Sequence, residues 1–299
     1  MIEESRLRAC LVDRWGLSDP TVEVHNGGMN SATWFVGQGG RRWVAKAVPP
    51  AGGAAFTGGL RVSGRVEAAG IAAGAPVPAR DGDLVTWVDQ VPLALLTWVP
   101  GVELDGQRPE QQRLIGTTLA RVHRALRDAV VDGAETFHWV VPGADHLTVR
   151  PWVRDAVTAG VAAYDNLGPG SLSWGLLHTD PAPEAFRLDR TTGACGLIDW
   201  SVAMRGPLLY DLASAAMYVG GPEYAGELVG AYLAGGVLSR TEVDRGLLPM
   251  LRFRWAVQAD YFARRISVGD LTGIGSAADN EAGLADARHW LGRLCGRIW

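Results

Sequence analysis

The hydrophobic pattern of this chain changes its period at Pro100-Gly101, and this change limits the possible folds more than any other feature. Before that point, short alternating apolar runs lie between turn residues and predict strands. After it, apolar residues recur three and four positions apart and predict helices. We therefore expect an α+β fold with two lobes: a small antiparallel sheet with a helix in residues 1–98, and a mostly helical lobe in residues 99–299.

Turn residues divide the first lobe into short segments. A short helix is expected within residues 1–20. The stretch of small residues from Ala51 to Gly59 predicts a loop, and a longer helix is expected from about Leu60 to Ala73. Five strands are expected over residues 22–24, 32–36, 42–48, 84–87 and 92–99.

The second lobe begins with the clearest helical pattern of the chain, over residues 109–127. Ile115, Leu119 and Val122 share its apolar face. Residues 130–150 are expected to form an irregular insertion, and residues 176–198 a loop and a hairpin. Further helices are expected over residues 151–165, 208–219, 222–234, 240–266 and 279–298.

Charge, hydropathy and cysteine usage exclude several classes of protein. The net charge of −4 lacks the basic surplus that marks nucleic-acid binders. No apolar run is long enough to span a bilayer, and the polar, acidic start is unlike a signal peptide. Cys10, Cys195 and Cys295 are odd in number and far apart, which suits a reducing compartment. These features predict a cytoplasmic protein with no nucleic-acid or membrane partner.

Two apolar runs each end in an aspartate, and a hairpin lies between them. The first is Leu176 to Asp180, and the second is Cys195 to Asp199. Because a hairpin brings its ends together, both carboxylates are expected to face one cleft. Phosphoryl transfer requires such a pair: one carboxylate orients the acceptor hydroxyl and takes its proton, and the other holds Mg²⁺ at the phosphates.

The first lobe provides groups that suit a nucleotide. Lys46 is the single lysine among 28 basic residues, and arginine does not replace a compact ammonium at a phosphate contact. It lies on an expected strand that follows a glycine-containing hairpin, and from there it can reach the α- and β-phosphates. The loop from His25 to Ser31 can cover the phosphates, and Asn30 lies in it. The strand from Leu95 to Val99, with Thr97, is expected to present its backbone to the nucleotide base.

The chain resembles the aminoglycoside phosphotransferase and choline kinase-like superfamily, which has a protein-kinase-like fold. The resemblance covers about residues 20–265, and its motifs occur in the order of the family. They are Gly-Gly-Met-Asn-Ser (27–31), Trp-Val-Ala-Lys (43–46), Gly-Ala-Pro-Val-Pro (74–78), Thr-Trp-Val-Pro-Gly (97–101), Leu-Ala-Arg-Val-His (119–123), Leu-His-Thr-Asp-Pro (177–181), Leu-Ile-Asp-Trp (197–200) and Arg-Gly-Pro-Leu-Leu-Tyr-Asp-Leu-Ala (205–213).

The resemblance implies a role for each conspicuous polar residue. It implies that Asp180 is the catalytic base, that Asp199 binds Mg²⁺ and that Lys46 contacts the phosphates of ATP or GTP. It also implies that Asp211 supports the catalytic loop from below, and that His178 holds this loop by hydrogen bonds rather than by moving protons.

Two positions depart from the pattern of the family. Ala185 stands where the family has a metal-binding asparagine, and a methyl group cannot bind a metal. Either Glu184 supplies the missing oxygen, or water fills the site. Ser63 stands near the position of the glutamate that pairs with the lysine in kinases, so Glu67, one turn further on, is the acidic candidate.

The acceptor is less constrained than the reaction. An aminoglycoside-like antibiotic or another hydroxyl-bearing natural product is the first expectation, and its amines would need an acidic patch in the C-terminal region. Acidic candidates are Asp260, Asp270, Asp279, Glu281 and Asp286, and pocket-lining aromatic candidates are Trp139, Trp152 and Trp174. The alternatives are a Ser/Thr kinase of a ribosomally made peptide in lanthipeptide-type biosynthesis, which could work with a partner enzyme, and a nucleotide-binding pseudokinase.

Overall fold

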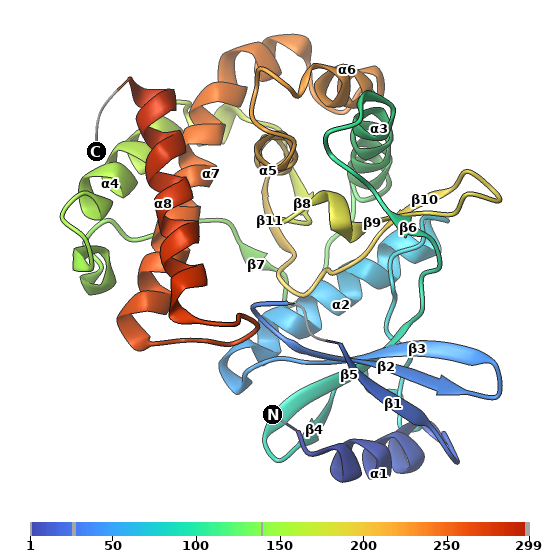
Figure 1. Ribbon diagram of the computed structural model, residues 1–299. Helices are drawn as coiled ribbons and strands as arrows, with labels where there is room; N and C mark the ends of the chain where they lie inside the picture. The colour runs from blue at the N-terminus through green and yellow to red at the C-terminus, as the bar shows by residue number, and fades with distance from the viewer. Residues whose placement is uncertain (1, 26–27, 139, 297–299) are drawn as a thin grey trace.

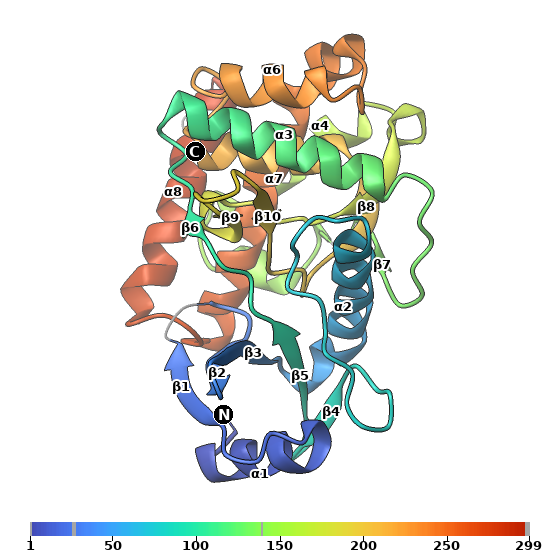
Figure 2. The same ribbon diagram turned by 90° about the vertical axis from the view of Figure 1, so that its right-hand side faces the viewer.

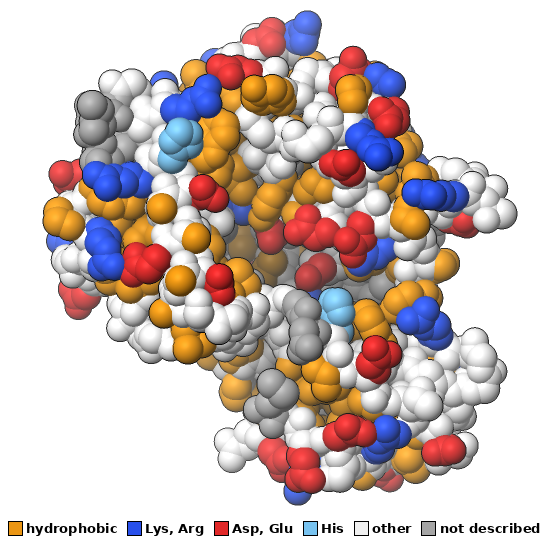
Figure 3. Space-filling model, viewed as in Figure 1, with side chains coloured by type: hydrophobic (Ala, Val, Ile, Leu, Met, Phe, Trp, Pro, Cys, Tyr) orange, Lys and Arg blue, Asp and Glu red, His pale blue; other side chains and the backbone are white. Residues whose placement is uncertain are grey.

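The computed structural model describes residues 2–25, 28–138 and 140–296, which form two lobes with a hollow between them (Figures 1 and 3). The N-terminal lobe contains helix α1 (Glu4–Trp15), a five-stranded sheet and helix α2 (Gly53–Ala68). The C-terminal lobe contains the remaining helices and two small three-stranded sheets. This arrangement agrees with the predicted α+β architecture.

The N-terminal sheet is antiparallel throughout and has the strand order β1-β2-β3-β5-β4. Lys46 lies opposite Thr33 on one side and Ala94 on the other, so these three side chains share one face of the sheet. The opposite face packs on α1 through buried residues such as Trp34 and Leu95. The strands are β1 (Thr21–His25), β2 (Ala32–Gln38), β3 (Arg41–Ala47), β4 (Thr86–Val88) and β5 (Val91–Thr97).

Helix α2 corrects the prediction of a loop before Leu60, because the helix already begins at Gly53. Glycine weakens a helix by about 0.5–1 kcal/mol relative to alanine, so the sequence favoured a loop. Tertiary packing reverses this preference. Gly58 and Gly59 lie so close to the backbone of the second lobe that a side chain would not fit at either position. Figure 2 shows α2 standing upright and reaching from the level of the N-terminal sheet toward the second lobe.

Six helices build the second lobe within the described residues. The first begins at Pro109, as predicted, and Ile115, Leu119 and Val122 are buried on it. The long helix α7 packs against α4, α5 and α8 and joins the largest hydrophobic core. The helices are α3 (Pro109–Ala125), α4 (Val153–Asp165), α5 (Leu209–Tyr218), α6 (Gly226–Ala234), α7 (Arg240–Val268) and α8 (Ala277–Cys295). None of the described helices combines the length and the apolar character that crossing a membrane requires.

Short strands place the two predicted catalytic aspartates at the hollow. β9 and β10 form the expected antiparallel hairpin, and β8 pairs with β11 beside it. Asp180 follows β8, and Asp199 follows β10. The strands are β6 (Val102–Glu103), β7 (Glu135–Thr136), β8 (Trp174–Leu177), β9 (Phe186–Leu188), β10 (Cys195–Leu197) and β11 (Met204–Pro207).

Candidate active site

A buried carboxylate supports the loop that carries Asp180. Asp211, on α5, is fully buried and accepts hydrogen bonds from the backbone N–H groups of His178 and Thr179, both at 2.7 Å. His123 Nε2 lies 3.0 Å from the same carboxylate, and Tyr232 bonds the other nitrogen of that ring at 2.7 Å. These contacts place Asp211 directly below the loop, because a carboxylate can accept from several donors at once.

The His178 side chain links the two loops that carry the predicted catalytic pair. Its Nε2 donates to the carbonyl of Ile198 at 2.8 Å, and its Nδ1 accepts from the N–H of Asp180 at 3.3 Å. These two bonds require the neutral ring with its proton on Nε2. The imidazole is therefore occupied on both sides, which suits the predicted structural role.

Asp199 forms an ion pair with Lys46 across the two lobes. The lysine side chain is 9% exposed and the aspartate side chain 51% exposed, so the carboxylate remains open to the hollow. Desolvation acts to raise the pKa of Asp199, but the Lys46 ammonium outweighs it and lowers this pKa to about 2. Asp199 also has a positive φ of 71°, a conformation that is costly for a residue with a side chain. The chain accepts this strain at the point where it turns the carboxylate toward Lys46.

Asp180 is held by two residues that the sequence did not identify. Its Oδ1 accepts a hydrogen bond from the phenol of Tyr218 and another from Arg254 Nη2 at 3.1 Å. Half of the Asp180 side chain is exposed, whereas that of Arg254 is only 6% exposed. The available signal in the sequence was an arginine between Phe253 and Trp255, but the contact joins residues that lie far apart in the chain.

Glu67 takes a different position from the one expected. Its carboxylate accepts from the backbone N–H of Ala75 at 2.9 Å and of Ala73 at 3.3 Å, and it lies 3.3 Å from the Thr97 hydroxyl. Glu67 therefore closes the turn at the C-terminal end of α2. The expected pair with Lys46 is not formed within the described part of the chain, where Lys46 pairs with Asp199.

The strand predicted to bind the nucleotide base already forms backbone hydrogen bonds within its own lobe. Thr97 donates its N–H to the carbonyl of Ala75 at 2.9 Å, so its carbonyl is the backbone group left for a nucleotide base. Val99 is buried just beyond the end of β5, and the side chains of Val99 and Ile198 both lie about 4 Å from the position of a Cβ added to Gly74. The roles of Thr97 and Val99 in base binding stay predictions.

The predicted phosphate loop contacts the second lobe. Asn30 Oδ1 accepts from the Tyr261 hydroxyl at 2.9 Å, and the carbonyl of Met29 accepts from Arg265 at 3.0 Å. Ser31 is buried, at 8% exposure. Figure 1 shows this loop meeting the α7–α8 connection. Residues 26 and 27 of the predicted loop lie outside the described residues.

The donor set at Asp199 fits magnesium. No cluster of three histidine, cysteine, aspartate or glutamate side chains occurs in the described ranges. Mg²⁺ does not need one, because it binds through one or two carboxylates together with water and substrate phosphates. Ala185 is buried, and its carbonyl accepts from the N–H of Ile198 at 2.9 Å, so its methyl group lies beside the Asp199 loop. Glu184 is exposed next to it, and its role as a ligand stays a prediction.

The expected acidic patch is largely engaged within the protein. Asp260 pairs with His146 at 2.7 Å, Asp270 with Arg265 at 3.1 Å and Glu281 with Arg150. Asp279 caps the start of α8. Of the expected aromatic residues, Trp174 donates to the carbonyl of Pro169, Trp152 lies beneath Arg288, and Trp139 lies outside the described residues. The described contacts thus engage four of the five acidic candidates, and the fifth, Asp286, is exposed on α8.

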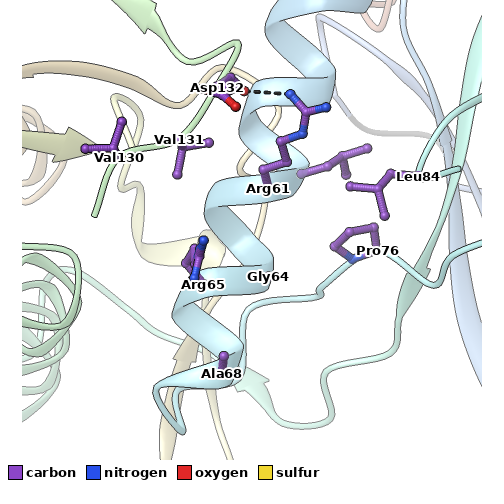
Figure 4. A pocket seen from close by; sticks show the side chains of 10 residues that line it. Arg61, Gly64, Arg65, Ala68, Pro76, Leu84, Val130, Val131 and Asp132 are labelled. Atoms are coloured by element: carbon purple, nitrogen blue, oxygen red, sulfur yellow. Dashed lines mark hydrogen bonds between the residues drawn. The ribbon is translucent and has the colours of Figure 1, made fainter. Parts of the chain in front are cut away.

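Figure 3 shows acidic side chains gathered along the hollow between the lobes. A separate hollow of about 460 Å³ lies against α2, where Arg61 donates to the carbonyl of Asp132 (Figure 4). Its ten lining residues include none of the predicted site residues. The interlobe hollow is therefore the candidate active site.

Comparison with known proteins agrees with this geometry. A family model described as the phosphotransferase enzyme family matches residues 21–245. The homoserine kinase of Azorhizobium caulinodans is 32% identical over 178 residues, which cover 56% of this chain and 53% of that protein. The chain spans about half the length of the curated relatives it matches.

Two solved structures share the fold over nearly all of this chain. One is an amicoumacin kinase in complex with AMP-PNP and Ca²⁺, with a TM-score of 0.72, 14% identity and coverage of 97% of this chain and 93% of that chain. The other is a microcompartment-associated aminopropanol kinase, with a TM-score of 0.70, 16% identity and coverage of 98% and 96%. The predicted family resemblance and the kinase-like α+β fold are therefore confirmed.

Proposed function

We propose a reaction for this chain, which belongs to the phosphotransferase enzyme family: it transfers the γ-phosphoryl group of ATP or GTP to a hydroxyl of a small molecule. One observation carries the proposal. A single imidazole, that of His178, bonds the backbone at Asp180 and at Ile198, next to Asp199, while Lys46 reaches Asp199 from the other lobe. This arrangement supports the proposal, because it brings Asp180, Asp199 and Lys46 to one hollow, where they suit the roles of base, metal ligand and phosphate contact.

The proposed roles follow from position and charge. Asp180 orients the acceptor hydroxyl and takes its proton. Lys46 contacts the phosphates from the cleft face of the sheet. Asp199, whose low pKa keeps it ionised, and water are the groups that hold Mg²⁺. When bound, Mg²⁺ neutralises charge on the phosphates.

A small acceptor suits the hollow better than a polycation or a long peptide. Three of the acids expected to bind amines, Asp260, Asp270 and Glu281, form ion pairs within the protein. The α7–α8 connection also closes one end of the hollow, because Gly273 packs against the carbonyl of Gly28, where an added methyl group would lie 2.3 Å from the oxygen. Since the relatives include homoserine and aminopropanol kinases, we propose a small amino alcohol or hydroxy amino acid as acceptor. The aminoglycoside-like, peptide and pseudokinase alternatives stay predictions.

A direct assay tests the proposal. Purified protein is incubated with Mg²⁺, γ-labelled ATP or GTP, and a panel containing L-homoserine, 1-amino-2-propanol, choline and an aminoglycoside. We expect one small alcohol to become labelled. Asp180→Asn and Asp199→Asn should each abolish labelling, while Asp244→Asn, an exposed change on α7, should retain it. A wild-type protein that neither binds nucleotide nor hydrolyses it would overturn the proposal.

A further inference from the structure

We infer that Arg254 is a positioning residue for Asp180: together with Tyr218, it fixes one carboxylate oxygen so that the other faces the acceptor. This inference rests on the proposed function, and it assigns a role to two residues outside the motifs of the sequence. Its basis is the hydrogen bonding of a buried guanidinium next to a half-exposed carboxylate.

Arg254 is held from three directions. Its Nε donates to the Ser214 hydroxyl at 3.0 Å, and its Nη1 donates to Gln258 Oε1 at 2.8 Å. Its Nη2 lies 3.1 Å from Asp180 Oδ1 and 3.3 Å from the Tyr218 hydroxyl. Because the guanidinium is planar and rigid, the hydrogen bonds of Nε and Nη1 also fix the position of Nη2.

Ser214 connects the guanidinium to the catalytic loop by a second route. Its hydroxyl accepts from Arg254 Nε and lies 3.3 Å from the carbonyl of Thr179, the residue before Asp180. Arg254 therefore contacts the aspartate directly and the backbone before it through one intermediary. Burying an unpaired guanidinium would carry a large desolvation free energy, and pairing it with a carboxylate offsets much of that free energy.

Tyr218 supplies the second fixed donor. Burial, and then the negative charge of Asp180, raise the pKa of its phenol well above the usual value, so the hydroxyl remains protonated and donates. Both donors bond the same oxygen, Oδ1. The carboxylate plane is thereby set, and Oδ2 is the oxygen that remains for the acceptor hydroxyl.

One face of α7 also connects this centre to the predicted phosphate loop. Arg254, Gln258, Tyr261 and Arg265 are spaced four, three and four residues apart, which places them on one helical face. The first bonds Asp180, and the last two bond residues 29 and 30. About 16 Å of helix separates the ends of this stripe. A single rigid element thus sets the position of the base relative to the phosphates.

Kinetics of three variants test the inference. Tyr218→Phe removes only the hydroxyl, Arg254→Lys keeps the charge but not the geometry, and Arg254→Met removes both. We expect kcat to fall about 10- to 100-fold, because small misplacements of a catalytic group have effects of this size. The kcat of Arg254→Lys should lie between that of Arg254→Met and that of the wild type. The KM for MgATP should stay within about twofold, because these residues do not contact the lysine side of the hollow.

Two acceptors and one control separate the possible results. The reactions are phosphorylation of whichever panel alcohol is turned over and slow MgATP hydrolysis, in which water is the acceptor. Arg245→Met, on the same helix but bonded only to Ser171 among the described contacts, should behave as wild type. Thermal unfolding shows whether Arg254→Met folds. If Arg254→Met does not fold, the kinetics of Tyr218→Phe, which is nearly isosteric with the wild type, still test the inference.

The role of Arg254 is overturned if Tyr218→Phe and Arg254→Lys retain the wild-type kcat, or if their defect lies only in the KM for MgATP. An active wild type with such variants leaves the proposed function intact. An inactive wild type overturns both proposals together.

Discussion

Gly59 on α2 packs against the carbonyl of Trp200, so closely that a methyl group on its Cα would lie 1.9 Å from the oxygen. Trp200 directly follows the predicted metal ligand, Asp199. The first lobe therefore touches the metal loop through bare backbone, and the position of α2 is tied to the position of that loop.

Gly59→Ala should destabilise the protein, because neither backbone can move away without disturbing the packing around it. We expect a loss of about 1–3 kcal/mol in the free energy of unfolding and a higher Mg²⁺ requirement for activity. The matched control is Gly64→Ala on the same helix, where nothing lies within 4 Å of an added methyl group. This control should be neutral or stabilising by up to about 1 kcal/mol. Urea unfolding of both variants checks the prediction, and equal stabilities would contradict it.

Asp211→Asn should weaken the catalytic loop. In the wild type, the backbone N–H groups of His178 and Thr179 donate to the two oxygens of Asp211. The amide of asparagine has the same shape, but it replaces one of these oxygens with an N–H₂ group, which cannot accept. We expect a loss of about 3 kcal/mol in the free energy of unfolding, since buried donors lose a charged acceptor. Chemical unfolding measures it. Asp128→Asn, at an exposed position, is the control and should change little.

Asp199→Asn should change the pH dependence of stability. The pKa of Asp199 is about 2 in the folded protein, below the value of about 3.9 for an unperturbed aspartate. A carboxyl group with a lowered folded-state pKa stabilises the fold above its unfolded value and loses this contribution as the pH falls toward its folded value.

The free energy of unfolding of the wild type should therefore fall more steeply than that of Asp199→Asn between about pH 4 and pH 2. Urea unfolding in the absence of nucleotide and Mg²⁺, repeated across this interval, measures the two slopes. Parallel curves would show that the ion pair with Lys46 does not hold Asp199 ionised.

Ala185→Asn should lower the concentration of Mg²⁺ that gives half-maximal activity. The added amide oxygen would lie beside the Asp199 loop, because the carbonyl of Ala185 already bonds Ile198. We expect a decrease of several-fold in a magnesium titration. Ala194→Asn, in the exposed hairpin, is the control and should leave the titration unchanged.

Glu184→Gln tests the alternative ligand in the same titration. If Glu184 binds the metal, removing its charge should raise the magnesium requirement. An unchanged requirement in both Glu184→Gln and Ala185→Asn would show that neither position faces the metal.

Sequence reasoning identified the two-lobe fold because strand and helix periods differ along the chain, and such periods depend on local burial. It missed the start of α2, because local propensity treats Gly58 and Gly59 as helix breakers. These two glycines allow α2 to pack directly against the backbone of the other lobe. Local propensity also could not show that Glu67 bonds the backbone at residues 73 and 75, because these contacts depend on how the turn after α2 folds back.

The sequence by itself determined which groups are available for chemistry: one lysine on a strand and two aspartates that each end an apolar run, in an order shared with a kinase family. These residue types are dictated by the reaction, so they are visible without coordinates. Only the tertiary structure decided how the groups are held. Arg254 and Tyr218 reach Asp180 from helices far along the chain, and their contacts exist because the helical lobe packs in one way. Contacts between distant segments depend on the packing of the whole core, and no local pattern encodes them.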